Sequence, residues 1–246
     1  MAISSDKVAF ITGANRGIGF ETAKGLGALG ISVVIGARDT AKGEAAAVAL
    51  RALGYQAYAL HYDANMASSA DSCFEYFSQY YGKLDILINN AGMLQEPMMG
   101  STSTTVSDDI LQSTFQTNLF AVVALTQKLL PLIKLAPAGR IVNLSSVLAS
   151  LTMHSMAKSP IDPAKAFAYN ASKTALNAYT IHLAHALRGT NVKVNSAHPG
   201  WVKTELGGAR APMELIDGGK TSVHLATLDD NGKTGGFFHL NDALPW

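Results

Sequence analysis

The strongest indication of the fold is a stretch near the amino terminus, Val8-Ala9-Phe10-Ile11-Thr12-Gly13-Ala14-Asn15-Arg16-Gly17-Ile18-Gly19. Its first four residues form an apolar run typical of a buried strand, and a helical pattern follows from about Ile18 to Leu29. The glycines between them allow a tight turn and the close approach of a phosphate, whose charge the amino end of the helix stabilises. The spacing GxxxGxG differs from the commoner GxGxxG pattern, so a purely structural role for these glycines stays open.

The alternation of apolar runs and helix-length segments continues along the chain. The alanine-rich segment 41–53 has good helix propensity and stops at Gly54. Further strands are expected at residues 31–35, 58–62, 84–88, 141–144 and 192–197. Six such units predict an α/β fold, a Rossmann-like doubly wound parallel sheet with helices on both faces, in one domain spanning residues 1–246.

The charge balance excludes some classes of partner. The 246 residues carry 19 Lys and Arg against 18 Asp and Glu, a net charge of +1. No broad field is therefore available to attract nucleic acid or an anionic membrane. The single cysteine, Cys73, excludes an intramolecular disulfide and offers no metal-ligand cluster, which fits a reducing compartment.

Neither candidate targeting segment predicts export or insertion into a membrane. Residues 1–7 are polar and lead into no long apolar signal region. Residues 119–136 are interrupted by polar and proline residues, so they fall short of the roughly 20 apolar residues that cross a bilayer. We interpret them as a buried helix and expect a cytoplasmic protein. Residues 101–107 and 153–165 have little periodicity and are expected to be surface excursions.

Two arginines indicate which dinucleotide the turn binds. Arg38 follows the second strand, where this fold places the adenosine ribose and where NAD enzymes commonly carry an acid. Arg16 projects from the glycine turn toward the same region, and two guanidiniums bind a 2′-phosphate far better than a hydroxyl. The pattern favours NADP(H). The alternative is that Arg38 is solvated or pairs with Asp39, or that Asp39 binds the ribose of NAD.

Tyr169-Asn170-Ala171-Ser172-Lys173 supplies a candidate proton donor. Tyr169 and Lys173 stand at i and i+4 of a helix expected to start near Tyr169, so their side chains share one face. A free phenol titrates near 10, and a nearby ammonium together with the positive ring of the cofactor would lower that pKa. This spacing is common by chance, so the interpretation depends on further partners.

Two serines and Asn118 supply candidate partners. Ser145 and Ser146 end the segment Ile141-Val142-Asn143-Leu144-Ser145-Ser146, at the carboxyl edge where such sheets bind ligands, and either hydroxyl is suited to a substrate oxygen that gains charge. Asn118 is a polar residue just ahead of an apolar helix segment. Its amide can anchor water and lead protons toward Lys173, or it can be a helix kink or a satisfied core amide.

Taken in order, these motifs resemble those of the short-chain dehydrogenase/reductase family, and within it the NADPH-dependent carbonyl reductases. The resemblance spans essentially the whole chain. It rests on the glycine turn at 13–19, Asn89-Asn90-Ala91-Gly92, Asn118, Ser146, Tyr169 with Lys173, and Pro199-Gly200-Trp201-Val202-Lys203-Thr204.

The resemblance implies a role for each catalytic candidate. Tyr169 is the acid/base, Ser146 polarises the carbonyl, Lys173 lowers the pKa of the tyrosine and binds the nicotinamide ribose, and Asn118 completes a proton relay. It also implies a set of NADP(H) contacts. These are Gly13, Asn15, Arg16, Gly17, Ile18, Gly19, Arg38, Asp63, Asn90, Gly92, Tyr169, Lys173, Pro199, Gly200, Val202 and Thr204.

The chain also departs from the family pattern. Between Ser146 and Tyr169 the chain carries more residues than many family members, although this extension is shorter than that of related carbonyl reductases. It could block tetramer formation or border the active site, and monomer and homo-oligomer both stay open. The segment 205–216 is brief, which predicts a small lid and an open cleft for bulky or aryl substrates. Its candidate lining residues are Met93, Leu94, Met153, Met156 and Trp201. His198 is interpreted as a loop histidine.

The sequence therefore predicts an oxidoreductase that transfers hydride from NADPH to a ketone or aldehyde, reversible to alcohol oxidation. An NAD-dependent alcohol dehydrogenase is the alternative within the same chemistry. A non-catalytic NADP(H) sensor is the alternative from another class, although a sensor has no need of Ser146, Tyr169, Lys173 and Asn118 together. The physiological substrate and its stereochemistry have no signature in the sequence.

Overall fold

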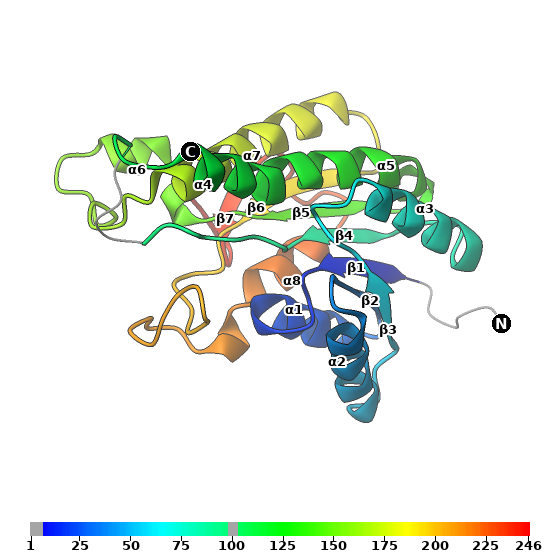
Figure 1. The fold of residues 1–246 in the computed structure, drawn as a ribbon. Helices are drawn as coiled ribbons and strands as arrows, with labels where there is room; N and C mark the ends of the chain where they lie inside the picture. The colour runs from blue at the N-terminus through cyan, green and yellow to red at the C-terminus, as the bar shows by residue number, and fades with distance from the viewer. Residues whose placement is uncertain (1–6, 98–102) are drawn as a thin grey trace.

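The computed structural model describes residues 7–97 and 103–246, and its strands form one twisted sheet between two layers of helices (Figure 1). The strand order is β3-β2-β1-β4-β5-β6-β7-β8, parallel except for the last pair. The strands are β1 (Val8–Thr12), β2 (Ser32–Ala37), β3 (Ala57–His61), β4 (Ile86–Asn89), β5 (Arg140–Leu144), β6 (Lys193–Ala197), β7 (Phe237–His239) and β8 (Asp242–Ala243). The doubly wound parallel sheet expected from the sequence is confirmed.

Helices cover both faces of this sheet (Figure 1). One face packs against α1 (Gly17–Ala28), α2 (Thr40–Ala52) and α8 (Lys220–Ala226). The other packs against α3 (Ser68–Tyr80), α5 (Ala121–Leu135) and α7 (Phe167–Ala186). Strands β1 and β2 are buried at every position, which is why they read as continuous apolar runs rather than alternating ones.

A ladder of polar side chains crosses the buried centre of the sheet. The Asn89 amide donates to Asn143 Oδ1 at 2.8 Å and to Thr126 Oγ1 of α5 at 3.0 Å. The Asn143 amide donates to Thr180 Oγ1 of α7 at 2.8 Å, and Ser196 also donates to Thr180. Since an unpaired polar group in this interior is costly, the ladder favours one register of β4, β5 and β6 beneath the two helices.

The predicted strands and helices are found within a few residues of their expected bounds, and three short elements were missed. The structure adds β7 and β8, because strands of three and two residues carry too little pattern to recognise. It also inserts one π-helical turn, Gln116–Phe120, between α4 (Asp108–Phe115) and α5. The sequence gives no signal for the wider turn, which re-aims the side chains that follow it.

The excursion expected at 153–165 is largely exposed, although it begins within the short helix α6 (Leu151–Ser155) and buries Ile161. The excursion expected at 101–107 is exposed over most of 103–107, and its first two residues lie outside the described part of the chain. Residues 1–6 of the polar start also lie outside it.

The apolar helix expected at 119–136 is confirmed as a core element. Within the described residues, Asp108–Leu135 is the one stretch long and apolar enough by composition to cross a bilayer. Its residues Leu125, Leu129 and Ile133, spaced at i and i+4, are buried against α3, α7 and the sheet. The apolar character of this stretch therefore serves packing in the fold.

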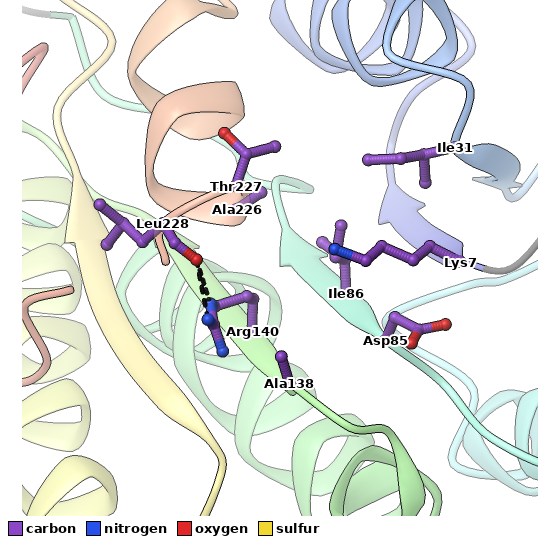
Figure 2. A pocket seen from close by; sticks show the side chains of 9 residues that line it. All are labelled: Lys7, Ile31, Asp85, Ile86, Ala138, Arg140, Ala226, Thr227 and Leu228. Carbon is purple, nitrogen blue, oxygen red and sulfur yellow. Dashed lines mark hydrogen bonds between the residues drawn. The ribbon is translucent and has the colours of Figure 1, made fainter. Parts of the chain in front are cut away.

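A buried arginine closes the amino-terminal edge of the sheet, opposite the carboxyl edge. Arg140 is 3% exposed, and its guanidinium donates to the carbonyl oxygens of Leu228 at 2.7 Å, Asp229 at 3.0 Å and Gly139 at 2.9 Å. Figure 2 shows it beside a cavity of about 50 Å³ that Asp85 also lines. The guanidinium joins β5 to the turn after α8 through these carbonyl acceptors and through the exposed carboxylate of Asp230 at 3.3 Å.

We expect Arg140→Ala to lower the free energy of unfolding by about 2–4 kcal/mol, because it removes a buried side chain and its hydrogen bonds to the main chain of Leu228 and Asp229. Urea denaturation followed by circular dichroism measures the change. Arg51→Ala is the control, since Arg51 is an exposed arginine that also bonds a carbonyl, that of Ala57. Equal losses for the two variants would contradict the role assigned to Arg140.

Candidate functional site

The site begins where the strand order reverses, between β1 and β4. The chain leaves the carboxyl end of β1 toward α1 on one face and the carboxyl end of β4 toward the other face, which opens a crevice between the two loops. All four catalytic candidates and the glycine turn follow the carboxyl ends of β1, β4 and β5 or lie on α7 and the π turn beside them.

The glycine turn has the shape that a dinucleotide phosphate needs. Gly13 and Gly17 have φ values of +66° and +63°, in the region that favours glycine. A Cβ at Gly13 would lie 3.0 Å from Ala91 Cα, whereas one at Gly17 would meet nothing within 4 Å. Arg16 precedes α1 with no side-chain cap, and the first turn of α1 holds no acid. Its main-chain amides thus suit the pyrophosphate of a dinucleotide.

Asn90 stabilises the same turn. Its side-chain amide donates to the carbonyl oxygens of Thr12 at 2.7 Å and Gly13 at 3.2 Å, and its main-chain N–H donates to Thr12 Oγ1 at 3.0 Å. Gly19 packs against that amide so closely that a Cβ would lie 2.5 Å from Asn90 Nδ2. The segment after β4 therefore stabilises the conformation of the glycine turn.

The residues proposed to select the cofactor are exposed beyond β1 and β2. Asp39 is the N-cap of α2, where its carboxylate accepts from Lys42 N at 3.0 Å, and this hydrogen bond lowers the pKa of Asp39. Asp39 also pairs with the Lys42 ammonium, while Arg38 is exposed. Arg16 forms an ion pair with Glu205, and both side chains are mostly exposed. An ion pair between exposed groups is weak, so Arg16 can exchange this partner for a phosphate.

Tyr169 and Lys173 lie side by side in the first two turns of α7, one turn apart as expected. Lys173 Nζ is 5.9 Å from the centroid of the Tyr169 ring and donates to the carbonyl oxygen of Leu144 at 2.7 Å. Both residues are buried, at 7% and 4% exposure. The Leu144 carbonyl belongs to β5, so the ammonium connects α7 to the strand that leads into Ser146.

Burial shifts both titrating groups. It raises the pKa of Tyr169 to about 12, and a hydrogen bond with the Ser146 hydroxyl acts in the opposite direction. Burial also lowers the pKa of Lys173 to about 8, because the charged ammonium is disfavoured away from water. Ser146 is thus within reach of the phenol, and its hydroxyl also accepts from Leu148 N at 3.2 Å.

Asn118 lies in the π turn and is fully buried. Its Oδ1 accepts from Met93 N at 2.8 Å, and its Nδ2 donates to Met93 O at 2.9 Å and to Ser172 Oγ at 3.0 Å. The structure thus agrees with both structural interpretations of Asn118: it lies at a helix irregularity, and the hydrogen bonds of its amide are satisfied. Its side chain also lies near Lys173, because a Cβ on Gly92 would be 3.4 Å from Asn118 Oδ1 and 3.3 Å from Lys173 Nζ.

The segment after β6 lies across from the glycine turn. Val202 pairs with Met213 in an isolated parallel bridge, and Thr204 Oγ1 accepts from Gly207 N at 2.9 Å. Gly200 has a φ of +92°, and a Cβ there would overlap Met213 Sδ. These contacts shape the loop that begins at Pro199.

Asp63, the expected adenine contact, lies just beyond β3, where its carboxylate accepts from Asn65 N at 2.9 Å. Of the expected substrate-lining residues, Leu94 and Met153 pack against the buried cluster around Tyr169. Met156 and Trp201 are exposed at 53% and 52%, and Trp201 Nε1 donates to Gly207 O at 2.7 Å.

His198 is a half-buried histidine of the loop after β6, where its ring bonds the main chain. Burial, and secondarily the neighbouring His239, lower the pKa of His198 to about 3, so the ring is neutral. Its Nδ1 accepts from Val147 N at 3.1 Å, which fixes the residue after Ser146. Across residues 7–97 and 103–246, no group of three His, Cys, Asp or Glu side chains could hold a metal ion.

Sequence analysis missed Glu96, a carboxylate that is only 5% exposed. Its Oε2 accepts from the main-chain N–H of Tyr169 at 3.0 Å. Glu96 belongs to none of the motifs, and its partner lies 73 positions away. The only available signal was its position four residues after Gly92, in the segment that ends near the catalytic candidates.

Comparison with known proteins agrees with this geometry. The family model of the short chain dehydrogenases matches residues 7–215. Carbonyl reductase (NADPH) 1 of Mus musculus is 30% identical over 286 residues, covering 99% of each chain. Among solved structures, salutaridine reductase from Papaver somniferum has a TM-score of 0.83 at 27% identity, over 94% of this chain and 99% of that one. NADPH-bound carbonyl reductase from chicken fatty liver has a TM-score of 0.83 at 25% identity, over 100% of both. The chain therefore belongs to the short-chain dehydrogenase family of oxidoreductases and is similar to its carbonyl reductases.

Proposed function

We propose that this protein reduces a ketone or aldehyde to an alcohol with NADPH, in a reaction that is reversible. The observation that carries the proposal is the position of Tyr169, buried between the Ser146 hydroxyl and the Lys173 ammonium at the carboxyl edge of the sheet. This edge also holds the uncapped glycine turn. One crevice therefore combines a proton donor with a place for a dinucleotide.

The proposed chemistry divides into hydride and proton transfer. NADPH, when bound, supplies the hydride to the carbonyl carbon. The Ser146 hydroxyl holds the carbonyl oxygen by a hydrogen bond that strengthens as negative charge develops there. The Tyr169 phenol gives its proton to that oxygen, which completes the alcohol and leaves a phenolate. In alcohol oxidation the same phenolate takes the proton back.

Lys173 stabilises the phenolate through its positive charge and returns a proton toward it. Its ammonium lies one helical turn from Tyr169, and burial strengthens the interaction between the two charges. The space beside Gly92 brings Lys173 near Asn118, whose amide would order the route by which solvent restores the proton. Asn118 thus contributes to the relay through its position in the π turn.

NADP(H) is the proposed cofactor because the adenosine end of the crevice carries cations. Arg38 is exposed beyond β2, and the neighbouring carboxylate of Asp39 caps α2 and pairs with Lys42. That arrangement favours Arg38, with Arg16, as the ligands of a 2′-phosphate. The similarity to carbonyl reductases whose names include NADPH supports the same choice.

The proposed substrate is a bulky or aryl carbonyl compound. Leu94 and Met153 give the region around Tyr169 an adaptable apolar wall, and the loop after Thr204 is short. The proposal also includes a cytoplasmic location, with no nucleic acid or membrane partner, in keeping with the near-neutral net charge and the single buried Cys73. The number of subunits is left open.

We expect Tyr169→Phe to lower kcat for carbonyl reduction by about 10²–10⁴-fold, since it removes the proton donor and keeps the ring. NADPH oxidation with a panel of aryl and alkyl ketones measures kcat, and fluorescence titration measures NADPH binding, which should weaken far less than kcat falls because Tyr169 is one of many expected cofactor contacts. A wild-type protein that binds NADPH and reduces no carbonyl would instead support the sensor function.

The rate of reduction should also fall as pH rises above about 8. The pKa of Lys173 is lowered to about 8, so its ammonium is present below that pH and is lost above it. The pKa of Tyr169 is about 12, so the phenol itself stays protonated over the same range. Initial values of kcat/KM against pH measure the effect. A flat profile up to about 10, the usual value for a lysine, would show that Lys173 stays charged.

Arg38→Asp should raise KM for NADPH by about 10- to 100-fold and leave KM for NADH nearly unchanged, because a charge-assisted bond to phosphate contributes about 1.5–3 kcal/mol. The two cofactors are compared at a fixed carbonyl concentration. Arg51→Asp makes the same change of charge on the far end of α2 and should alter neither value. Equal losses for both cofactors would remove the assignment, and a wild-type preference for NADH would favour the NAD-dependent alcohol dehydrogenase.

A further inference from the structure

We propose that Glu96 is a positioning residue for Tyr169, an inference that rests on the proposed function. Its carboxylate holds the first turn of α7 so that the phenol faces Ser146 and the substrate oxygen. Three features support this role: Glu96 is a buried acid, it accepts the main-chain N–H of Tyr169, and the C=O of Tyr169 is held by a second hydrogen bond.

The burial of Glu96 requires a structural reason. A carboxylate that is only 5% exposed loses most of its hydration, and such groups are rarely buried without partners. One of its partners is the main-chain N–H of Tyr169, which donates to Glu96 Oε2 at 3.0 Å. A hydrogen bond to an ionised acceptor is about twice as strong as a neutral one, which offsets part of the loss of hydration.

The carboxylate replaces a cap that α7 does not supply itself. Ala166 stands at the N-cap position and has no side chain able to accept a hydrogen bond. Tyr169 is the third residue of α7, one of the first-turn positions whose N–H has no partner within the helix. Glu96, from a segment 73 positions earlier, accepts that N–H. Its negative charge is also favourable at the amino end of a helix.

Tyr169 is held from its other side as well. The Ser172 hydroxyl donates to the carbonyl oxygen of Tyr169 at 2.7 Å, and Asn118 Nδ2 donates to Ser172 Oγ at 3.0 Å. Asn118 in turn bonds both main-chain groups of Met93. The N–H and the C=O of Tyr169 are therefore both connected to the segment that runs from Met93 to Glu96.

This double attachment sets where the phenol can lie. The phenol extends several bonds from the main chain, so a small rotation of the first turn of α7 moves the hydroxyl away from Ser146. A misplacement of about 1 Å can lower a rate about 10²-fold, even when the catalytic groups are intact. Loss of Glu96 should therefore lower kcat without weakening the binding of NADPH, whose proposed contacts lie mostly on other loops.

Three substitutions separate position from charge. Glu96→Gln keeps an oxygen acceptor at the same distance and removes the charge, whereas Glu96→Asp keeps the charge and withdraws the acceptor by one carbon. Glu96→Ala removes both. We expect kcat per NADPH-binding site to fall by about 10- to 100-fold in Glu96→Ala and Glu96→Asp, and to stay near the wild-type value in Glu96→Gln. If Glu96→Ala does not fold, the comparison of Asp with Gln decides.

Asp85 provides a matched control at the opposite edge of the sheet (Figure 2). Its carboxylate is 2% exposed and accepts the main-chain N–H of Val8 at 2.9 Å, across 77 positions. Asp85→Ala should lower Tm and leave kcat per binding site unchanged. A merely structural Glu96 would behave in the same way.

Hydrogen–deuterium exchange gives a readout that does not depend on turnover. The amides at the start of α7 should exchange faster in Glu96→Ala than in the wild type, and should be unaffected in Asp85→Ala. Unchanged exchange would overturn the attachment, and faster exchange with wild-type kcat would overturn the positioning role. A wild type inactive on every carbonyl would instead overturn the proposed function, and exchange would still decide the attachment.

Discussion

The segment that follows β4 is the physical constraint on which the site depends. Within seven residues it bonds the glycine turn through Asn90, leaves space for the Lys173 ammonium at Gly92, binds Asn118 through Met93, and accepts the Tyr169 N–H at Glu96. Parallel strands make this possible because their carboxyl ends share one edge. A shift of β4 by one residue would disturb every one of these contacts.

Burial is the second determinant, and it acts on the two titrating groups in opposite directions. It raises the pKa of Tyr169 and lowers that of Lys173, because each group loses hydration in its charged form. The interior thus favours a neutral phenol and a readily released proton on the lysine. Ser146 opposes the effect at Tyr169 by hydrogen bonding, and a cationic cofactor ring would act in the same direction.

The neutral polar ladder and the buried Arg140 stabilise different parts of the same sheet. At its centre, Asn89 and Asn143 fix the register of β4 and β5 beneath the helices. At its amino edge, the buried guanidinium of Arg140 donates mainly to carbonyl oxygens, and the carboxylate that pairs with it, Asp230, is exposed. Rigid packing at the amino edge provides a stable scaffold, and the loops at the carboxyl edge supply the functional residues.

Sequence alone was enough to predict the first six strands with helices between them, the glycine turn, and Tyr169, Lys173, Ser146 and Asn118 as candidates. Those features are local, since hydrophobic periodicity and short spacings express them within a few residues. Only the tertiary structure decided that Glu96 caps the helix of Tyr169, that Asn118 lies in a π turn, and that β7 extends the sheet. These depend on contacts between residues far apart in the chain, whose distances follow from strand register and helix packing rather than from any local pattern.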